Sequence, residues 1–205
     1  AGSVGGNGRN QPRLELWALD VGTEAWAPIA QPPLADVDRR SHGFLAWTGT
    51  ELVVGGGSAQ SAAGAALAAQ LEADGRSPTP AEAEVIGASP RADVAAYDPV
   101  EGTWRALPDA PLPVAGQERS GEVWTGTHVV VQEATTVGVG DRWLLLDPAT
   151  GEWRVTPVPV TGARQGAPAV WTGDELLIWS GEPTVTDVDP ASCCSPDGSG
   201  DSFTP

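Results

Sequence analysis

The sequence contains no lysine and no methionine, and it has only two histidines, two cysteines and one tyrosine. Its arginines number 11 against 27 acidic residues, so the formal net charge is −16. Such an acidic chain repels phosphate backbones and anionic membrane surfaces, and we therefore expect no nucleic-acid partner. No apolar run reaches the roughly 20 residues that a membrane span needs, which predicts no membrane span. Because residue 1 is alanine, we expect the chain to be a fragment of a longer protein.

Glycine and proline are abundant, with 26 and 19 residues, and tryptophan dominates the aromatic residues with nine. The first two values indicate a chain rich in turns and loops. Tryptophan in such excess indicates a repeated architectural role. Residues 1–13 are rich in glycine and asparagine and are interpreted as a linker or a cut edge.

Two motifs recur along the chain. The first is a Trp-Thr-Gly turn followed by an apolar run, and it begins at Trp47, Trp124 and Trp171. The second runs from an aspartate to a tryptophan six residues later, and these tryptophans are Trp26, Trp104 and Trp153. Both motifs show one spacing of 47–49 residues and another of 77–78 residues. The longer spacing is one period plus an insertion of about 30 residues, as expected of a repeat protein.

Each motif predicts a β-hairpin. Phe44–Trp47 and Leu52–Val54 flank a tight Thr-Gly turn. Asp93–Tyr97 and Trp104–Leu107 flank a turn in which Pro99 presets φ. Four short strands in each period are typical of the blades of a β-propeller.

The chain resembles the kelch-repeat family, which includes the central domain of galactose oxidase. The resemblance covers residues 14–182 apart from the insertion. It depends on Arg40-Ser41-His42 before the first strand, Gly55-Gly56-Gly57 after the second and Tyr97-Asp98-Pro99 at the third turn, together with the three tryptophans of the second motif and the proline-rich segment 107–113. It implies an all-β fold with about three propeller blades, which form an incomplete ring. Since rings close with 4–8 blades, we expect further blades or another chain to complete this one.

Residues 58–90 form the insertion, in a loop between the second and third strands of a blade. The alanine-rich segment 62–73 has leucines four residues apart and predicts a helix. Thr79-Pro80-Ala81-Glu82 matches a capping box with proline at the first helical position, so a short second helix through Ile86 is expected. The insertion is either a solvent-facing decoration or a lid or partner contact.

Three arginines each precede a Trp-Thr-Gly motif, namely Arg40, Arg119 and Arg164. Equivalent positions on successive blades would surround the axis on one face, where guanidinium groups can bind a carboxylated or sulfated ligand. The alternative is that each arginine anchors a neighbouring segment. His42 lies where kelch repeats often carry histidine, and we include it as a candidate ligand-binding residue with a structural alternative.

Residues 183–205 are interpreted as an acidic loop or tail rich in glycine, proline and serine. Cys193 and Cys194 are adjacent, and are candidates for a vicinal disulfide or for pairing with cysteines elsewhere. The spacing of the aspartates near Asp197 does not match an EF-hand, so a solvated loop is favoured over a calcium site. We expect no metal and no cofactor, since a copper-radical oxidase needs more tyrosine and histidine ligands than this chain has.

These observations predict a non-catalytic kelch propeller segment that binds a protein or a carbohydrate. The composition suggests a bacterial coding sequence of high GC content, and we expect the protein to be extracytoplasmic or secreted. The alternative is an enzyme on a kelch propeller, such as a sugar epimerase, lyase or oxidase, with its active site on the face of the loops joining strands two to three and four to one. A deep axial pocket that holds a histidine, tyrosine or carboxylate with a strongly perturbed pKa beside the three arginines would favour the enzyme, whereas a shallower surface of arginines and aromatic residues would favour the binding module.

Overall fold

Short antiparallel strands make up most of the chain in the computed structural model, which describes residues 16–114, 122–135, 138–157, 164–183 and 200–203. The strands predicted around both turn motifs are confirmed. Among the described residues there are two α-helices, and none is long and apolar enough to cross a bilayer. The protein is therefore mostly β-sheet, built of several small antiparallel sheets.

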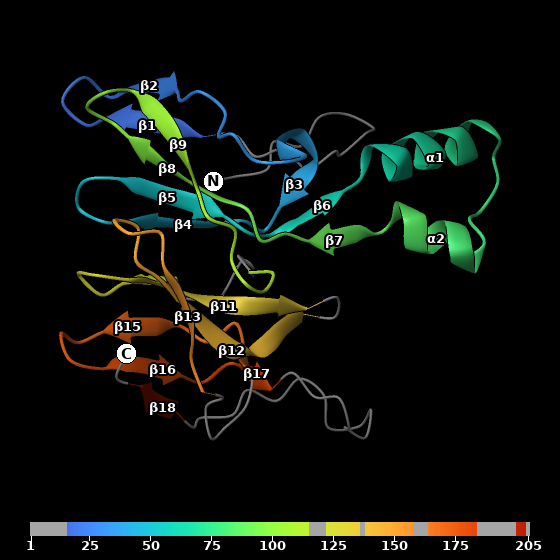
Figure 1. The fold of residues 1–205 in the computed structure, drawn as a ribbon. Helices are drawn as coiled ribbons and strands as arrows, with labels where there is room; N and C mark the ends of the chain where they lie inside the picture. The colour runs from blue at the N-terminus through green and yellow to red at the C-terminus, as the bar shows by residue number, and fades with distance from the viewer. Residues whose placement is uncertain (1–15, 115–121, 136–137, 158–163, 184–199, 204–205) are drawn as a thin grey trace.

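Four sheets follow one another along the chain and are stacked from top to bottom in Figure 1. The hairpin sheet contains β1 (Trp17–Asp20) and β2 (Ala25–Pro28). Sheet I contains β4 (Phe44–Trp47), β5 (Leu52–Gly55), β8 (Val94–Asp98) and β9 (Thr103–Leu107). Sheet II contains β10 (Val123–Trp124), β11 (Val129–Thr135), β12 (Gly138–Leu146) and β13 (Trp153–Val155). Sheet III contains β15 (Ala169–Trp171), β16 (Leu176–Trp179) and β18 (Gly200–Phe203).

The sheets share one strand register. In the first hairpin of sheets I, II and III, each Trp-Thr-Gly tryptophan pairs with the first residue of the next strand: Trp47 with Leu52, Trp124 with Val129, and Trp171 with Leu176. In the second motif, each tryptophan pairs with the residue just before the turn aspartate: Trp26 with Leu19, Trp104 with Tyr97, and Trp153 with Leu146. The sequence repeat is thus a repeat of backbone pairing.

The two turn motifs have clear physical causes. In the first, Thr48 Oγ1 accepts a hydrogen bond from the Glu51 N–H and donates one to the Glu51 carbonyl, and Gly49 supplies the positive φ of 96° that the turn needs. In the second, the Asp98 carboxylate accepts from the N–H groups of Val100 and Glu101. Because both patterns depend only on neighbouring residues, they recur wherever the motif does.

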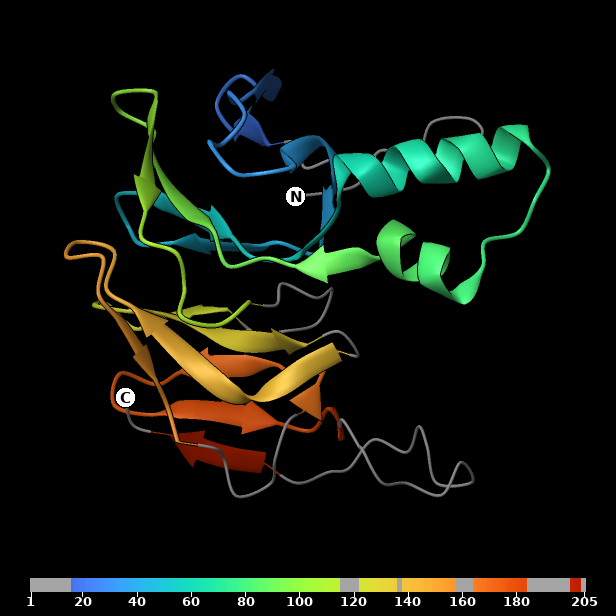
Figure 2. The same cartoon turned by 45° about the vertical axis from the view of Figure 1, so that its right-hand side comes forward.

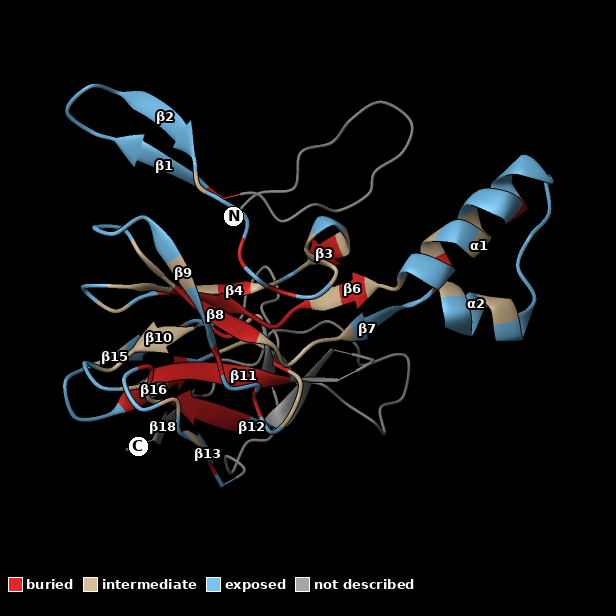
Figure 3. Ribbon diagram, turned by 45° about the horizontal axis from the view of Figure 1, so that its top comes forward, coloured by how far each residue is buried: buried red, intermediate tan, exposed pale blue. Residues whose placement is uncertain are grey.

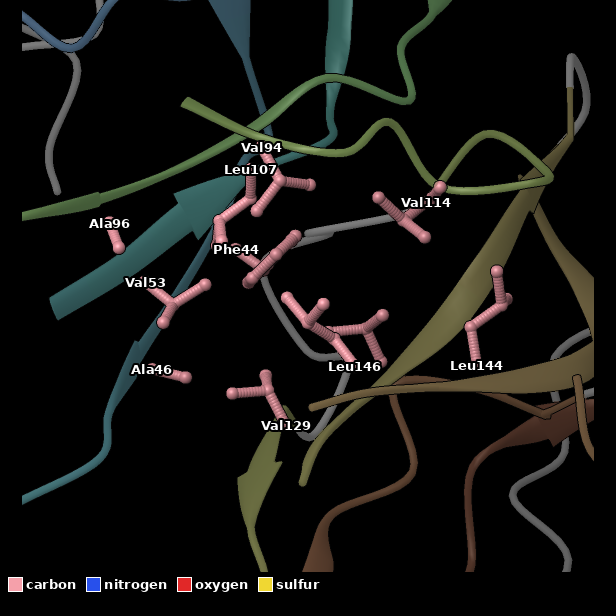
Figure 4. Packing of buried hydrophobic residues seen from close by; sticks show 12 residues of the cluster. Phe44, Ala46, Val53, Val94, Ala96, Leu107, Val114, Val129, Leu144 and Leu146 are labelled. Atoms are coloured by element: carbon pink, nitrogen blue, oxygen red, sulfur yellow. The ribbon is translucent and has the colours of Figure 1, made fainter. Parts of the chain in front are cut away.

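Both faces of sheet II are buried. Val129, Val131, Leu144 and Leu146 face sheet I, in the cluster that Figure 4 shows around Phe44. The alternate residues of β11 and β12 face sheet III, and these are Val130, Trp143 and Leu145. Side chains alternate across a strand, so strands covered on both sides need continuous apolar runs, as the sequence has here. Strands β11 and β12 are among the red strands of Figure 3.

Tryptophans of the second motif also join successive sheets by hydrogen bonds. Trp104 Nε1 donates to the carbonyl of Ala30, which follows β2 (2.8 Å). Trp153 Nε1 donates to the carbonyl of Pro108, which follows β9 (2.9 Å). In both cases the acceptor lies four residues beyond the equivalent tryptophan of the preceding sheet. The repeat therefore specifies contacts between sheets as well as within them.

The two helices project from one end of the stack, opposite the end that carries the hairpin turns (Figure 2). The predicted helices are confirmed as α1 (Ala62–Ala73), capped by Ser61, and α2 (Pro80–Ile86), with the complete capping box at Thr79. They stand on a small sheet made of β3 (Arg40–Ser41), β6 (Ser58–Gln60) and β7 (Ala88–Pro90). A Cβ on Gly57 would overlap the Ser41 carbonyl, so glycine is needed where β5 leads into β6.

Sheet III differs from the sequence interpretation at its end. The expected tail of residues 183–205 includes β18, whose residue Phe203 pairs with Leu176. This is the register of Tyr97 with Leu52 in sheet I, so β18 is the third strand of sheet III. For Gly200–Phe203 the tail interpretation is wrong, since this pairing gives them a place in the sheet. The rest of 184–205 lies outside the described residues.

Candidate functional site

Arg40 and His42 are the candidate residues that the structure describes in full, and both lie at the base of the helical projection. The 3₁₀-helix η1 (Val37–Arg39) leads into β3, which begins with Arg40. The segment before β8 lies against it and supplies Arg91 and Asp93. Charged groups from two separate parts of the chain, residues 36–40 and 91–93, therefore lie together at the base of the helical projection.

Arg40 is buried, with 1 % of its surface exposed. Its NH2 group lies 2.7 Å from both carboxylate oxygens of Asp93 and also donates to the carbonyl of Ala35. Its NH1 group donates to the carbonyl of Gly56 (2.9 Å). The guanidinium thus anchors three segments to one another. This geometry corresponds to the structural alternative for Arg40, because a ligand would have to displace Asp93 to reach the charge.

A second ion-pair group adjoins the first. Asp36 accepts from Arg39 at 2.7 Å and from Arg91 at 2.6 Å. The hydrogen bond from Arg39, together with the nearby arginine charges, lowers the pKa of Asp36 below its ordinary value. The charges of two partly buried arginines, Arg39 and Arg91, are therefore compensated by an acidic group of the same chain. We find no described arginine at this base whose charge lacks an acidic partner.

His42 is exposed and has a φ of 57°, in the left-handed region. Its Nδ1 atom lies 3.0 Å from the Ser41 hydroxyl oxygen. The residue forms the bend between β3 and β4, beside Gly43. The His42 imidazole is therefore exposed to solvent. Its left-handed backbone conformation is explained by its position in the turn.

The other candidates are described in part or not at all. Arg164 begins β14 (Arg164–Gln165), which pairs with β17 (Glu182–Pro183) as β3 pairs with β6. Its backbone therefore holds the position that Arg40 holds, while its side chain lies outside the description. Arg119, Cys193 and Cys194 lie outside the described residues, so the expected ring of arginines and the cysteine pair stay predictions.

Sequence reasoning missed Glu122, which precedes β10. Strands β4, β10 and β15 are edge strands of sheets I, II and III, and β10 contacts both of the others. Glu122 is partly buried at this approach of β10 to β4. Burial raises the pKa of Glu122 above its ordinary value, since the charged form loses water there. No sequence motif indicated Glu122, because its surroundings form only where β10 approaches β4.

His128 lies at the opposite end, in the Thr-Gly turn of sheet II. Its Nε2 atom is 2.9 Å from Arg154, and its Nδ1 atom is 2.8 Å from the Thr127 hydroxyl. Burial first, and the Arg154 charge second, lower the pKa of His128. In the described ranges no three histidine, cysteine, aspartate or glutamate side chains are grouped so that they could hold a metal ion.

The stacked sheets, their shared register and the single helical projection define an all-β protein made of successive small antiparallel sheets. A solved structure of a protein called YjhT is similar to it, with 16% sequence identity and a TM-score of 0.57. The match covers 82% of this chain and 52% of the YjhT chain, so this chain spans about half the length of that structure. At this identity the likeness shows the fold alone. No protein-family model matches the chain, and no curated protein does.

Proposed function

We propose that this chain is a segment of a kelch-type β-propeller that binds a protein or a glycan as part of an exported bacterial protein. The observation that supports the propeller is the repeated strand register, together with the tryptophan N–H that sheets I and II each donate to the preceding sheet. Contacts of this kind between successive sheets are expected of a β-propeller, in which four-stranded sheets repeat around an axis. On this proposal, sheets I and II are whole blades, and the hairpin sheet and sheet III are incomplete ones.

The helical projection is the proposed binding element. It extends beyond the sheets at the end opposite the hairpin turns (Figure 2), and it exposes Val85 with 49 % of its surface accessible. The exposed alanines of α1 and the Arg76–Glu82 pair give the rest of its surface a mixed apolar and charged character. Such a surface favours a protein partner over an anionic ligand held by Arg40, whose charge Asp93 already neutralises.

A deletion tests this proposal without disturbing the sheets. Gln60 pairs with Ala88 where β6 and β7 meet the helices. Residues 61–87 can therefore be replaced by an Asn-Gly turn that closes β6 on β7. We expect this variant to keep the stability of sheets I and II and to lose binding on a glycan array and to cross-linked protein partners. Val85→Asp in the intact chain is the matched variant, because it removes one exposed apolar contact and keeps both helices. Unchanged binding by the deletion variant would refute the projection as the binding element.

Glu122 favours a second candidate, an enzyme on the same propeller. A half-buried carboxyl with a raised pKa beside β4 and β10 is the type of group that general acid–base chemistry uses. The alternative role is structural, because Glu122 lies where β10 approaches the edge strand β4. Glu122→Gln distinguishes the two. If turnover of a sugar substrate falls at least 100-fold while stability is kept, the enzyme is supported, and if only stability changes, the role is structural.

A further inference from the structure

The first turn of sheet II differs from that of sheet I in one ionisable side chain. In sheet I, Arg105 holds the Glu51 carboxylate, with 3.0 Å from Nε to Oε1 and 2.7 Å from NH2 to Oε2. In sheet II the same repeat positions hold Arg154 and His128, and the Arg154 NH2 group lies 2.9 Å from His128 Nε2. Sheet III has Glu175 at the position of Glu51, so the histidine is the exception among the three turns.

The contact with Arg154 requires His128 to be neutral. A guanidinium only donates hydrogen bonds, so His128 Nε2 must accept and carry no proton. The proton of the neutral ring is then on Nδ1, which lies 2.8 Å from the Thr127 hydroxyl oxygen and donates to it. A second proton on Nε2 would leave two donors and two positive charges facing each other. Protonation of His128 therefore breaks its contact with Arg154.

Two charged groups of the described chain act on His128. Arg154 comes from β13, and Asp147 comes from the turn after β12. Burial first and the Arg154 charge second lower the pKa of His128, and the Asp147 charge opposes them. Asp147 stays ionised between about pH 5 and 8, because the Ala149 N–H lowers the pKa of its carboxyl below the ordinary value. In this range His128 is thus the member of the group whose charge changes.

The contact joins the last strand of sheet II to its first turn. The strand order is β10-β11-β12-β13, so Arg154 reaches across β12 to meet His128 just before β11. Strand β13 has three residues, and a strand this short makes few backbone hydrogen bonds. In sheet I, Arg105 also donates to the carbonyl of Pro148 in the turn of the next sheet (2.8 Å), at the end of the stack opposite the helices (Figure 2). Loss of the anchoring arginine contact should therefore weaken the pairing of β13 with β12.

We propose that His128 is a pH switch for β13: the neutral ring anchors Arg154 to the first turn of sheet II, and the protonated ring loses this contact and weakens the strand. The inference depends on sheet II alone and not on what the protein binds. Because the pKa of His128 is below its ordinary 6.5, the stabilisation is complete above about pH 6.5 and is lost as the pH falls through the lower value. A carboxylate and a guanidinium both keep their charges over about pH 5–8, so the Glu51–Arg105 pair lacks this dependence.

Amide hydrogen exchange between about pH 5 and 8 tests the proposal in the full chain, with protection factors taken against intrinsic exchange at each pH. We expect the protection of Trp153–Val155 to decrease roughly two- to fivefold as His128 becomes protonated, the range that an exposed side-chain pair supports. The ring resonances of His128 in NMR spectra give the midpoint that this decrease should follow. Strand β9 (Thr103–Leu107) is the internal control, and its protection should stay constant.

Three variants complete the test. His128→Glu gives sheet II the ion pair of sheet I, and should keep β13 protected at every pH. Arg154→Met removes the cation, so the midpoint of His128 should rise and β13 should have the low protection of the acid form throughout. His42→Gln changes the other histidine and should leave the pH dependence intact. Constant protection of β13 in the parent chain, an unchanged His128 midpoint in Arg154→Met, or loss of the dependence in His42→Gln would each overturn the proposal.

Discussion

Replacing Asp93 by alanine should destabilise the fold severely, because it leaves the Arg40 charge buried and unpaired. The Arg40 side chain is 0% exposed, and that of Asp93 is 22% exposed. Breaking a buried ion pair by removing one partner costs about 3–5 kcal/mol. We expect a value near the lower limit, about 3 kcal/mol, since two carbonyls still accept from Arg40 and solvent reaches the Asp93 side. That is a large part of the 5–15 kcal/mol or so that stabilises a typical domain.

Urea denaturation followed by tryptophan fluorescence measures this cost, with the m-value checked for constancy. Glu51→Ala is the matched control, because it removes a carboxylate from the exposed Arg105 pair and should cost about 0–1 kcal/mol. The double variant Arg40→Met with Asp93→Ala should be more stable than Asp93→Ala alone, since it removes the unpaired charge. A loss below about 1 kcal/mol for Asp93→Ala, or no recovery in the double variant, would refute the argument that Arg40 is a buried anchor.

Three further outcomes are expected. Trp104→Phe removes the hydrogen bond to Ala30 and should cost about 1 kcal/mol in urea denaturation, whereas Trp26→Phe should cost almost nothing, since no described group accepts from its indole; equal losses would contradict the role of Trp104 in joining sheets. Glu24 has a φ of 56° at a turn position where the equivalent turns have glycine, so Glu24→Gly should slow amide exchange in β1 and β2 by relieving about 1 kcal/mol of backbone strain. Hydrogen bonds from Arg76 and Thr79 lower the pKa of Glu82 from 4.5 to about 2, so the stabilisation of α2 is complete above pH 4.5 and is lost as the pH falls toward 2. The protection factors of the α2 amides, taken against intrinsic exchange at each pH, should therefore decrease as the pH falls over that range, and Glu82→Gln should abolish the dependence.

Local chemistry made most elements predictable. The Thr-Gly turn closes through its own threonine hydroxyl, and the second turn closes through its own aspartate, so neighbouring residues suffice to define both hairpins. Helix α2 begins at a capping box whose members are three residues apart. The period of the motifs predicted separate sheets of equal register, because a repeated sequence repeats its pairing.

Contacts across the chain account for the differences. Arg40 meets Asp93 across 53 residues, and no spacing in the sequence indicated that this arginine would be buried. Strand β18 has few apolar residues and was interpreted as part of a tail, yet β16 offers it an edge with the register of sheet I. Glu122 acquires its raised pKa only where β10 approaches β4.

The turns, the helices and the repeat were predictable from the sequence, since each depends on residues close together along the chain. Tertiary structure decided which equivalent residues are covered: Leu146 is buried between two sheets, and Leu19, at the same repeat position, is exposed. The physical reason is that burial is a property of neighbours. A repeat specifies the same strand each time, and the sheet beside it decides whether that strand is core or surface.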